Sequence, residues 1–433
     1  VADQEALIQR ENGARKNEFT FRLSYQDQSG THTPVKSAEE LFADMSKNLD
    51  GTFELTEDLD ASSVSPQAAA VPGTFRGKLI GNGHKILNLH TSLFETVSGG
   101  TIENLILEDA QITSGAKGVL ANEVIKKSVV DRVYVVDSVI SNTSVNMVGG
   151  FAGRLNDSVT KESAAINLSL TAYNTIGGMY GQTDASAVIR DCYVTGNLKG
   201  TLSHPLGSRV GGFVGWHNGK LERVFAKVQI TSPDQKGSGG LVGGPDSGQP
   251  VMKDAFVMTD GNVQRIAGFS IFGNAETKNL YEYEKSTAVT NRTESTGDKI
   301  QEVTDDALRT REFYRDTLGF DETVWNLDLV TDGKLPSLAA DPTSKDLEDY
   351  EIEENPSQIP GYGDVRKDEA YREDRETAYK NLSMLMPYAD TAVWVEQGIA
   401  LDDAAGLVLK KISRILPLAA DGRLVVGVPA LAP

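Results

Sequence analysis

The residue types that most often carry catalysis or bind metals are sparse in this chain of 433 residues. No two histidines have the His-x-x-x-His spacing that binds zinc on one helix face; the five are His32, His84, His90, His204 and His217. The single cysteine, Cys192, excludes an internal disulfide and a cysteine cage for zinc. We therefore expect no catalytic residue, cofactor or metal site within this chain.

One serine, Ser247, stands in a segment that could be read as a nucleophile loop. Gly244-Pro-Asp-Ser-Gly248 is similar to the loop that carries the nucleophile of trypsin-like proteases, with His204 or His217 as candidates for its base. In those enzymes the backbone N–H of the residue two before the serine stabilises the oxyanion. That residue is Pro245 here, which has no N–H. We interpret the segment as a turn.

The charge of the chain excludes two classes of partner. Its 42 lysines and arginines stand against 61 aspartates and glutamates, which gives a formal net charge of −19. Nucleic acids and anionic membranes require a basic surface that displaces counterions. No apolar run approaches the roughly 20 residues that span a bilayer. We therefore predict neither nucleic-acid binding nor membrane insertion.

The elements that must position any site come from an internal repeat. Two glycines, an apolar residue, one further residue and a third glycine recur about every 28 to 34 residues, at Gly149–Gly153, Gly177–Gly181, Gly211–Gly215 and Gly239–Gly243. A second pattern has apolar residues at positions 1, 4 and 6. It occurs at Ile102/Leu105/Leu107, Val130/Val133/Val135, Ile189/Cys192/Val194, Leu221/Val224/Ala226 and Met252/Ala255/Val257, with a weakened copy at Ile166/Leu168.

Repeats of this length with short strand-like segments predict a mainly β fold, a right-handed parallel β-solenoid. The paired glycines suit either a positive φ or coils that pack too closely for a Cβ atom. A helical repeat array is excluded, because two glycines would cost each helix about 2 kcal/mol. Cys192 then occupies a core position, where we expect a packed apolar side chain. A pectinase-like enzyme would need acidic residues clustered on neighbouring coils, and no such cluster recurs.

The flanking regions differ from the repeats in composition. Ser37-Ala-Glu-Glu40 forms a helix-capping box ahead of Leu41 and Phe42. Residues 341–354 are strongly acidic and are followed by Pro356 and Pro360, which indicates a linker. We predict an α/β N-terminal cap at 1–65, the solenoid at 66–290, a closing segment at 291–340, an acidic linker at 341–365 and the start of a truncated helical middle domain at 366–433.

These segments carry a resemblance to known bacterial proteins. The glycine-rich coils resemble the GLUG repeats of bacterial surface proteins. The segments Gln9–Gly13, Gly51–Ala61 and Tyr371–Pro387 are more specific. Together with the coils, they resemble the N-terminal and early middle regions of the immunoglobulin A-specific zinc metalloproteases of the streptococcal Zmp type.

The resemblance implies a function for the parent protein more than for this chain. The family holds its zinc in a His-Glu-x-x-His helix of a C-terminal domain, and that motif is not in this sequence. None of the catalytic residues can be carried over. The resemblance implies a non-catalytic region that engages immunoglobulin A or another host glycoprotein and positions the catalytic domain. The parent would be a virulence protease, secreted or attached to the bacterial cell wall, that cleaves the immunoglobulin A hinge. A GLUG-type surface adhesin without protease chemistry is the alternative.

An outward aromatic row is the candidate partner-binding surface. The residue between the last two core positions of the second pattern is predicted to point outward. These residues are Ile106, Tyr134, Asn167, Tyr193, Phe225, Phe256 and Tyr281. Either the closing segment near Trp325 covers this row, or the row docks an immunoglobulin or the catalytic domain. A second candidate surface is the longer coil around Gly200–Gly207, which contains His204.

Overall fold

The structure is a computed structural model. It describes residues 37–342 apart from 65–68, 114, 203–207, 234–236, 245–248, 262, 269–274 and 288–299. The predicted linker beyond residue 342, the predicted helical domain at 366–433 and the first 36 residues of the predicted cap lie outside the described residues.

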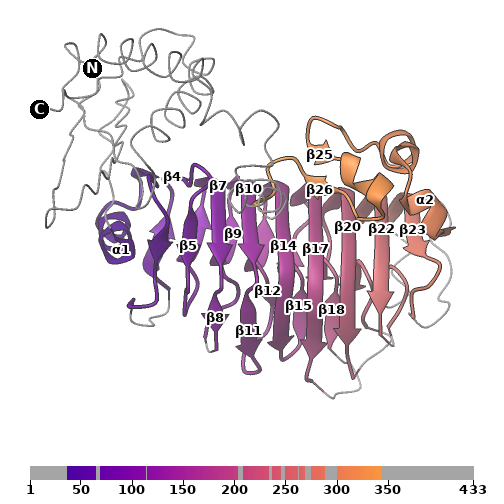
Figure 1. The fold of residues 1–433 in the computed structure, drawn as a ribbon. Coiled ribbons are helices and arrows are strands. Elements are labelled where there is room, and N and C mark those ends of the chain that lie inside the picture. Colours follow the sequence, from indigo (N-terminus) through magenta and orange to yellow (C-terminus); the bar gives the residue numbers. More distant parts are fainter. Residues whose placement is uncertain are drawn as a thin grey trace, which may run out of the picture. The chain divides into compact units, whose positions relative to one another are not determined.

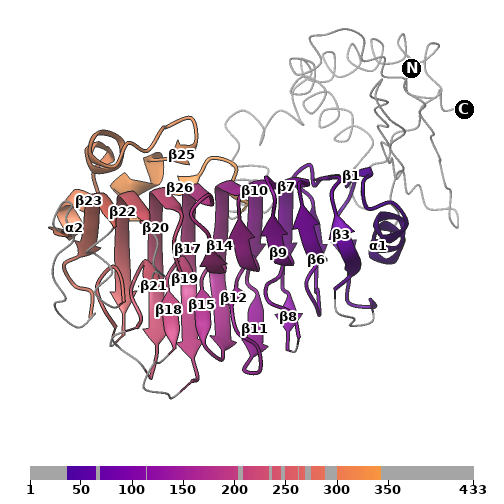
Figure 2. The same cartoon turned by 180° about the vertical axis from the view of Figure 1, so that it is seen from behind.

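The described residues form the predicted mainly β, parallel β-solenoid (Figures 1 and 2). A front sheet of fourteen strands and a back sheet of seven strands face each other along the stack. Successive coils add neighbouring parallel strands to each sheet, so that residues one coil apart lie side by side. The apolar interior between the two sheets is one continuous cluster of buried side chains from Ala38 to Leu280.

The strands of the front sheet lengthen along the stack and shorten again at its end. Its main path is β1 (Thr52–Glu54), β4 (Lys78–Ile80), β7 (Thr101–Glu108), β10 (Val129–Val136), β14 (Val159–Ala172), β17 (Val188–Gly200), β20 (Lys220–Thr231), β22 (Val251–Asp260), β23 (Glu276–Tyr283) and β24 (Gln301–Val303). The same sheet includes β2 (Leu59–Asp60), β5 (Lys85–Leu87), β8 (Gln111–Ile112) and β11 (Val139–Asn142).

The strands of the back sheet are shorter. They are β3 (Val71–Phe75), β6 (Phe94–Ser98), β9 (Ala121–Ile125), β13 (Ala152–Asn156), β16 (Tyr180–Thr183), β19 (Val214–Trp216) and β21 (Val242–Gly244). A separate three-stranded sheet contains β12 (Val148–Gly149), β15 (Thr175–Gly177) and β18 (Arg209–Gly211).

A column of left-handed residues explains the spacing of the second pattern. One residue in each coil of the front sheet has a φ between 49° and 55°: Asn104, Arg132, Glu162, Asp191, Arg223, Asp254 and Asn279. Simple alternation after Ile102 would turn residues 104 and 106 inward. The left-handed residue shifts the phase by one, so Leu105 and Leu107 are buried in the interior instead.

The third copy of this pattern lies at other residues than the apolar spacing predicts. In β14 the interior residues are Thr160, Ser163 and Ala165, because they pair with Ile189, Cys192 and Val194 of β17. The register then shifts between Ala165 and Leu168. The outward row therefore contains Ala164 in this coil, while Asn167 is exposed with a φ of 53°. Polar and small residues at all three positions hid the copy from an apolar pattern.

The recurring glycines are required by close packing between coils. None of the three glycines in any copy has a positive φ. A Cβ atom on Gly178 would lie 2.1 Å from the carbonyl oxygen of Gly212, and one on Gly212 would lie 2.0 Å from that of Gly240. A Cβ atom on Gly181 would lie 2.5 Å from the carbonyl carbon of Met147. Of the two explanations offered by the sequence, the close approach of backbones is the one observed.

A helix packs on the first coil. Helix α1 (Ala38–Lys47) begins at Ser37, whose side chain accepts a hydrogen bond of 3.2 Å from the backbone N–H of Glu40. This bond satisfies one of the helix's unpaired N–H groups. Leu41, Phe42 and Met45 are buried in the same apolar cluster as the solenoid. Strands β1 and β2 already belong to the front sheet, so the range predicted as a cap contains the first strands of the stack.

The closing segment is described from residue 300 onward and is mostly irregular. It contains α2 (Asp305–Leu308), a π-helical turn (Phe313–Thr317), β25 (Trp325–Asn326), a 3-10 helix (Asp328–Asp332) and β26 (Ser337–Leu338). Trp325 and Leu327 alternate at strand spacing, and both are buried. The alternation does not extend to Leu329. The 3-10 helix buries Val330 in its place.

Candidate functional site

The predicted row on the outside of the front sheet forms a stack of aromatic rings. Pairing between strands aligns Tyr193 of β17 with Phe225 of β20, and Phe225 with Phe256 of β22. The Tyr193 and Phe225 ring centroids are 5.0 Å apart with 4° between the ring planes. Those of Phe225 and Phe256 are 4.9 Å apart at 15°. These separations match the spacing of neighbouring strands, so the sheet itself stacks the rings.

The closing segment lies over this row. The Trp325 ring centroid is 6.4 Å from that of Tyr193 and 5.9 Å from that of Phe225. Phe313 packs edge-on against Phe256 at 6.2 Å and against Tyr281 at 5.2 Å. The row and the closing segment together form a second apolar cluster, separate from the interior of the solenoid. Figure 1 shows the closing segment beside the upper ends of β17, β20 and β22.

The sequence left two outcomes open for this row, and the structure shows the closing segment packed on most of its residues. Tyr134, Tyr193, Phe225 and Phe256 are at most 5% exposed, and only Tyr281 is partly exposed. Alternation predicted the outward direction of these side chains. An outward side chain is nevertheless buried here, because another part of the same chain lies on it. The other candidate, His204, lies outside the described residues.

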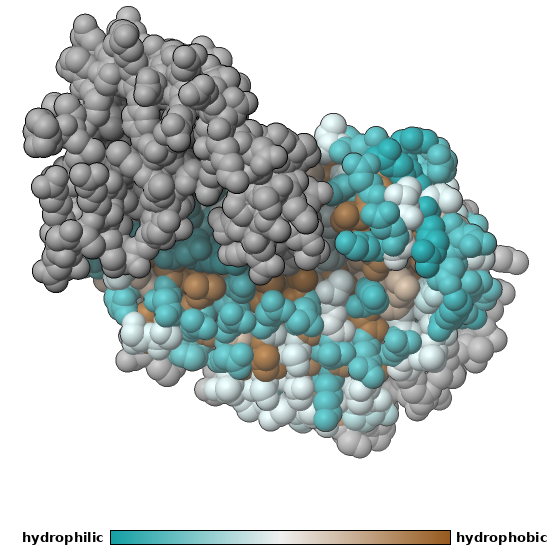
Figure 3. Space-filling view, viewed as in Figure 1, coloured by the Kyte–Doolittle hydropathy of each residue, from teal (hydrophilic) through white to brown (hydrophobic). Residues whose placement is uncertain are grey.

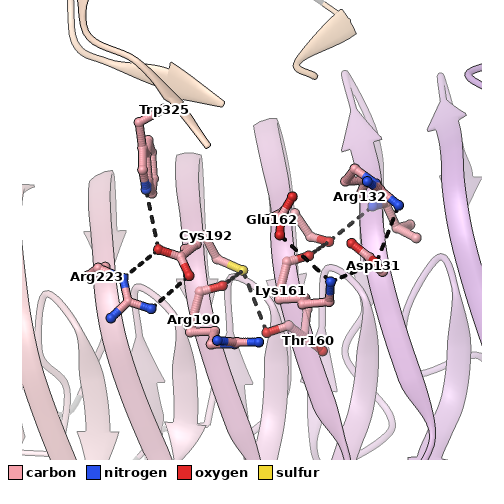
Figure 4. Close-up of polar contacts among 12 residues, drawn as sticks. Asp131, Arg132, Thr160, Lys161, Glu162, Arg190, Cys192, Arg223 and Trp325 are labelled. Atoms are coloured by element: carbon pink, nitrogen blue, oxygen red, sulfur yellow. Dashed lines mark hydrogen bonds and ion pairs between the residues drawn. The ribbon is translucent and has the colours of Figure 1, made fainter. Parts of the chain in front are cut away.

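A charged pair in β17 and β20 joins the closing segment to the front sheet. The Arg223 guanidinium contacts the Asp191 carboxylate through two hydrogen bonds, Nε to Oδ1 at 2.6 Å and Nη2 to Oδ2 at 2.9 Å. The hydrogen bond that Arg223 donates to Asp191 also raises the pKa of Arg223. The Trp325 indole N–H donates to Asp191 Oδ1 at 3.5 Å. Figure 4 shows Trp325 pointing from the closing segment toward this pair.

The neighbouring coils continue the same pattern of opposite charges. Lys161 Nζ lies 2.8 Å from Asp131 Oδ2 and 3.7 Å from Glu162 Oε1. The Arg132 guanidinium lies 3.4 Å from the same Asp131 oxygen (Figure 4). Each of these carboxylates is engaged by a cation at short range. These ion pairs therefore stabilise the stack of coils, and they leave no pair of these carboxylates poised for acid–base catalysis.

A buried carboxylate, Asp341, directly follows the closing segment. Asp341 is fully buried and accepts a hydrogen bond from the hydroxyl of Tyr193. Burial is the main cause that raises the pKa of Tyr134, and the negative charge of Asp341 raises it further. Tyr134 and Tyr193 lie on either side of Ala164 in the row. Asp341 thus attaches the end of the closing segment at the smallest residue of the aromatic row.

Of the nucleophile and base candidates of the sequence, His217 lies among the described residues, as does the single cysteine. Burial raises the pKa of the Cys192 thiol, whose sulfur lies 3.1 Å from the carbonyl oxygen of Arg190. Such a thiol is not a nucleophile at neutral pH, and Cys192 packs in the core as predicted. His217 is 1% exposed, and burial lowers its pKa to about 4. Its Nδ1 lies 2.9 Å from Thr183 Oγ1. Ser247 lies outside the described residues.

The described residues bring no metal-binding set together. Within them, no three histidine, cysteine, aspartate or glutamate side chains gather in a group that could hold a metal ion. Zinc, which the resemblance assigns to the parent protease, therefore has no matching ligands in this part of the chain. No helix among the described residues is long and apolar enough to cross a membrane.

Comparisons with known proteins identify relatives of the chain. Residues 1–137 match the family model of the M26 IgA1-specific metallo-endopeptidase N-terminal region. The immunoglobulin A1 protease of Streptococcus sanguinis is 25% identical over 464 aligned residues, which cover 95% of this chain and 22% of the relative. That of Streptococcus pneumoniae is 29% identical over 288 residues, 54% of this chain and 15% of the relative. The zinc metalloprotease ZmpC of Streptococcus pneumoniae serotype 4 is 26% identical, covering 59% of this chain and 16% of the relative.

Two solved structures are also similar. One is an IgA1 protease, with a TM-score of 0.46 and 21% identity over 66% of this chain and 22% of that chain. The other is a putative immunoglobulin A1 protease from Bacteroides ovatus, with a TM-score of 0.44 and 18% identity over 73% of this chain and 94% of that chain. The chain spans 22% or less of the length of the curated relatives named above. The comparisons confirm that it resembles the N-terminal region of the immunoglobulin A-specific zinc metalloproteases.

Proposed function

We propose that this chain is the non-catalytic substrate-engaging and positioning region of a zinc metalloendopeptidase. The names of its relatives point to immunoglobulin A1 as the partner, with another host glycoprotein as the broader class. Zinc would belong to the catalytic domain of the parent protein, which would be secreted or held at the bacterial cell surface. The solenoid would hold the substrate near that domain, since its stacked sheets form a rigid support with ordered outward side chains.

The exposed half of the front sheet supports this proposal most directly. Beyond the closing segment, β14, β17 and β20 carry two straight rows of polar side chains. Strand pairing aligns Ser169 with Asn197 and Gln229, and Thr171 with Lys199 and Thr231. All are exposed except Thr171, which is partly exposed. In Figure 3 the visible surface below the closing segment mixes hydrophilic residues with small hydrophobic areas. Such a surface suits a reversible interface with a hydrophilic protein.

An exposed aromatic side chain lies at the end of these rows. Tyr173 directly follows β14 and is 38% exposed, which makes it the one exposed large hydrophobic side chain among the described residues. Its carbonyl oxygen accepts a hydrogen bond of 2.9 Å from the backbone N–H of Leu202. Leu202 precedes His204 in the longer coil that the sequence singled out. Tyrosine is enriched among the few residues that dominate binding energy at protein interfaces. We therefore propose that the docking site includes Tyr173 and Lys199.

Binding of the 433-residue chain to immunoglobulin A1, measured by surface plasmon resonance, tests the docking site. We expect Tyr173→Ala and Lys199→Glu each to weaken binding about five- to thirtyfold, the range of an interface anchor. Lys126→Glu makes the same charge change in the exposed turn between β9 and β10, and it should leave the affinity unchanged. An unmodified chain that does not bind, or a Tyr173→Ala variant with unchanged affinity, would contradict the proposed site.

Cleavage assays separate the protease role from the adhesin alternative. The chain is mixed with a separately produced catalytic part of the parent protease, and immunoglobulin A1 cleavage is followed by gel electrophoresis. A positioning region should increase the cleavage rate, because holding a substrate near the reacting groups lowers the entropic part of the barrier. Binding without any increase in cleavage would favour a surface adhesin.

A further inference from the structure

The interior of the solenoid changes character at its last two coils. One row of residues runs through the front sheet, each paired with the next across neighbouring strands, and its members are buried from Leu107 to Glu282. It reads Leu107, Val135, Ala165, Val194, Ala226, Val257, Glu282 and Glu302. The row is apolar for six coils and acidic in the last two. Glu282 is 3% exposed, which is rare for a carboxylate.

An arginine from the other side of the stack reaches both carboxylates. Arg265 lies in a segment that bridges to the back sheet, where Ala267 pairs with Val242 of β21. Its Nε is 2.9 Å from Glu282 Oε2, and its Nη1 is 3.3 Å from Glu302 Oε1. The Glu282 side chain is 4% exposed and that of Glu302 is 61% exposed. One cation is therefore shared between a buried acid and an exposed acid.

This arrangement favours uptake of a proton by Glu282. With all three groups ionised, the end of the apolar interior carries one excess negative charge. Among the described residues, the charged groups that face Glu282 are Arg265 and Glu302. Burial raises the pKa of Glu282 to about 7; Arg265 opposes this shift and Glu302 adds to it. Because Glu282 is buried and the Glu302 side chain is exposed, loss of hydration penalises the charged form of Glu282.

We propose that protonation of Glu282 keeps the last coil packed on the rest of the solenoid. Protonated Glu282 lets β23 and β24 close over the apolar interior, whereas ionised Glu282 draws water into the end of the stack and loosens both strands. Strand β24 has three residues and leads directly into α2, whose cap residue is Thr304. Asp305, the first residue of α2, holds this segment against the end of β23. It contacts Lys285 and accepts a hydrogen bond of 2.6 Å from the Tyr283 hydroxyl. Loosening the last coil would thus release the beginning of the closing segment.

Amide hydrogen exchange of the 433-residue chain at pH 6 and pH 8, analysed by mass spectrometry, tests whether the opening of β23 and β24 depends on pH. After correction for the intrinsic exchange rate, we expect peptides from β23 and β24 to open about tenfold more at pH 8 than at pH 6. Glu282→Gln has the same shape and no charge, so its protection should be the same at both values. Glu302→Gln changes the exposed partner and should retain most of the pH dependence. Peptides from β10 serve as the internal reference.

Two results would overturn the proposal. One is an opening of β23 and β24 in the unmodified chain that does not change between pH 6 and pH 8. The other is a Glu282→Gln variant that keeps the full tenfold change, which would assign the proton to another group. The first result is obtained without any substitution, so the test does not depend on the folding of a variant.

Discussion

In both halves of the long front-sheet strands, every second side chain points out of the sheet. These outward side chains are buried in one half and exposed in the other. In β20, Phe225 and Gln229 both point out of the sheet, four residues apart. Phe225 is 1% exposed because the closing segment lies on it, while Gln229 is exposed. The composition of each half matches its environment, with aromatic rings under the cover and polar side chains outside it. In a solenoid, the outside of a sheet is therefore not the same as the surface of the protein.

Shortening a covered ring should have the largest effect on this comparison. Phe225 contacts two stacked rings and Trp325, so Phe225→Ala should lower the free energy of unfolding by about 3–5 kcal/mol. Gln229→Ala, on the same face of the same strand, should change it by less than about 0.5 kcal/mol. Urea unfolding followed by circular dichroism measures both. Equal effects would mean that the closing segment does not cover the row in solution.

Removing the carboxylate that joins the two regions should have the next largest effect. Asp191→Ala leaves Arg223 and the Trp325 indole without their shared partner, and we expect a loss of about 2–3 kcal/mol. Asp260→Ala removes an exposed carboxylate at the far end of β22 and serves as the matched control. Trp325 fluorescence should also shift to longer wavelength in the Asp191→Ala variant alone. An unshifted spectrum would show that the indole is held without this contact.

A smaller effect should come from the inward acid at the end of the stack. The folded-state pKa of Glu282, about 7, lies above its ordinary value of 4.5. The stabilisation by the bound proton is complete below pH 4.5 and is lost as pH rises through 7. Between pH 6 and pH 8 the chain should lose about 1.4 kcal/mol of unfolding free energy relative to Glu282→Gln. Urea titrations of both proteins at the two pH values give this difference, and parallel curves would refute it.

The smallest effect on stability should come from the proposed docking residues. Tyr173 and Lys199 are exposed, so their substitution should change the free energy of unfolding by less than about 0.5 kcal/mol while weakening partner binding. Thermal unfolding compared with the binding assay checks this separation. A large loss of stability in Tyr173→Ala would assign this ring to packing and remove it from the docking site.

The sequence predicted the coils well because their signals are local. The spacing of Val224 and Ala226 from Leu221 encodes a left-handed residue at Arg223, and it places all three apolar side chains inside. The paired glycines predicted a special backbone position without distinguishing a positive φ from close packing, since both requirements select glycine. The third coil was misaligned because Thr160, Ser163 and Ala165 carry little hydrophobic signal.

The candidate site was harder to predict because it depends on contacts between distant segments. Trp325 and Asp191 are 134 residues apart in the chain, and Tyr193 and Asp341 are 148 apart. No periodicity reports such a contact. The sequence offered two outcomes for the aromatic row, covered or exposed, and the structure has the first. Glu282 was missed because the pattern was sought with apolar residues only: Glu282 occupies the last core position of its coil, next to Tyr281 and paired with Val257.

The position of the closing segment has a mechanical consequence. Hydrogen bonds between coils run along the stack, so tension applied along that direction would normally peel the coils apart one by one. The closing segment runs along this direction and contacts Tyr193, Phe225, Phe256 and Tyr281 from four successive strands. Tension on the chain beyond Asp341 would first load the attachment at Tyr193, and we expect these four coils to rupture as one unit under force.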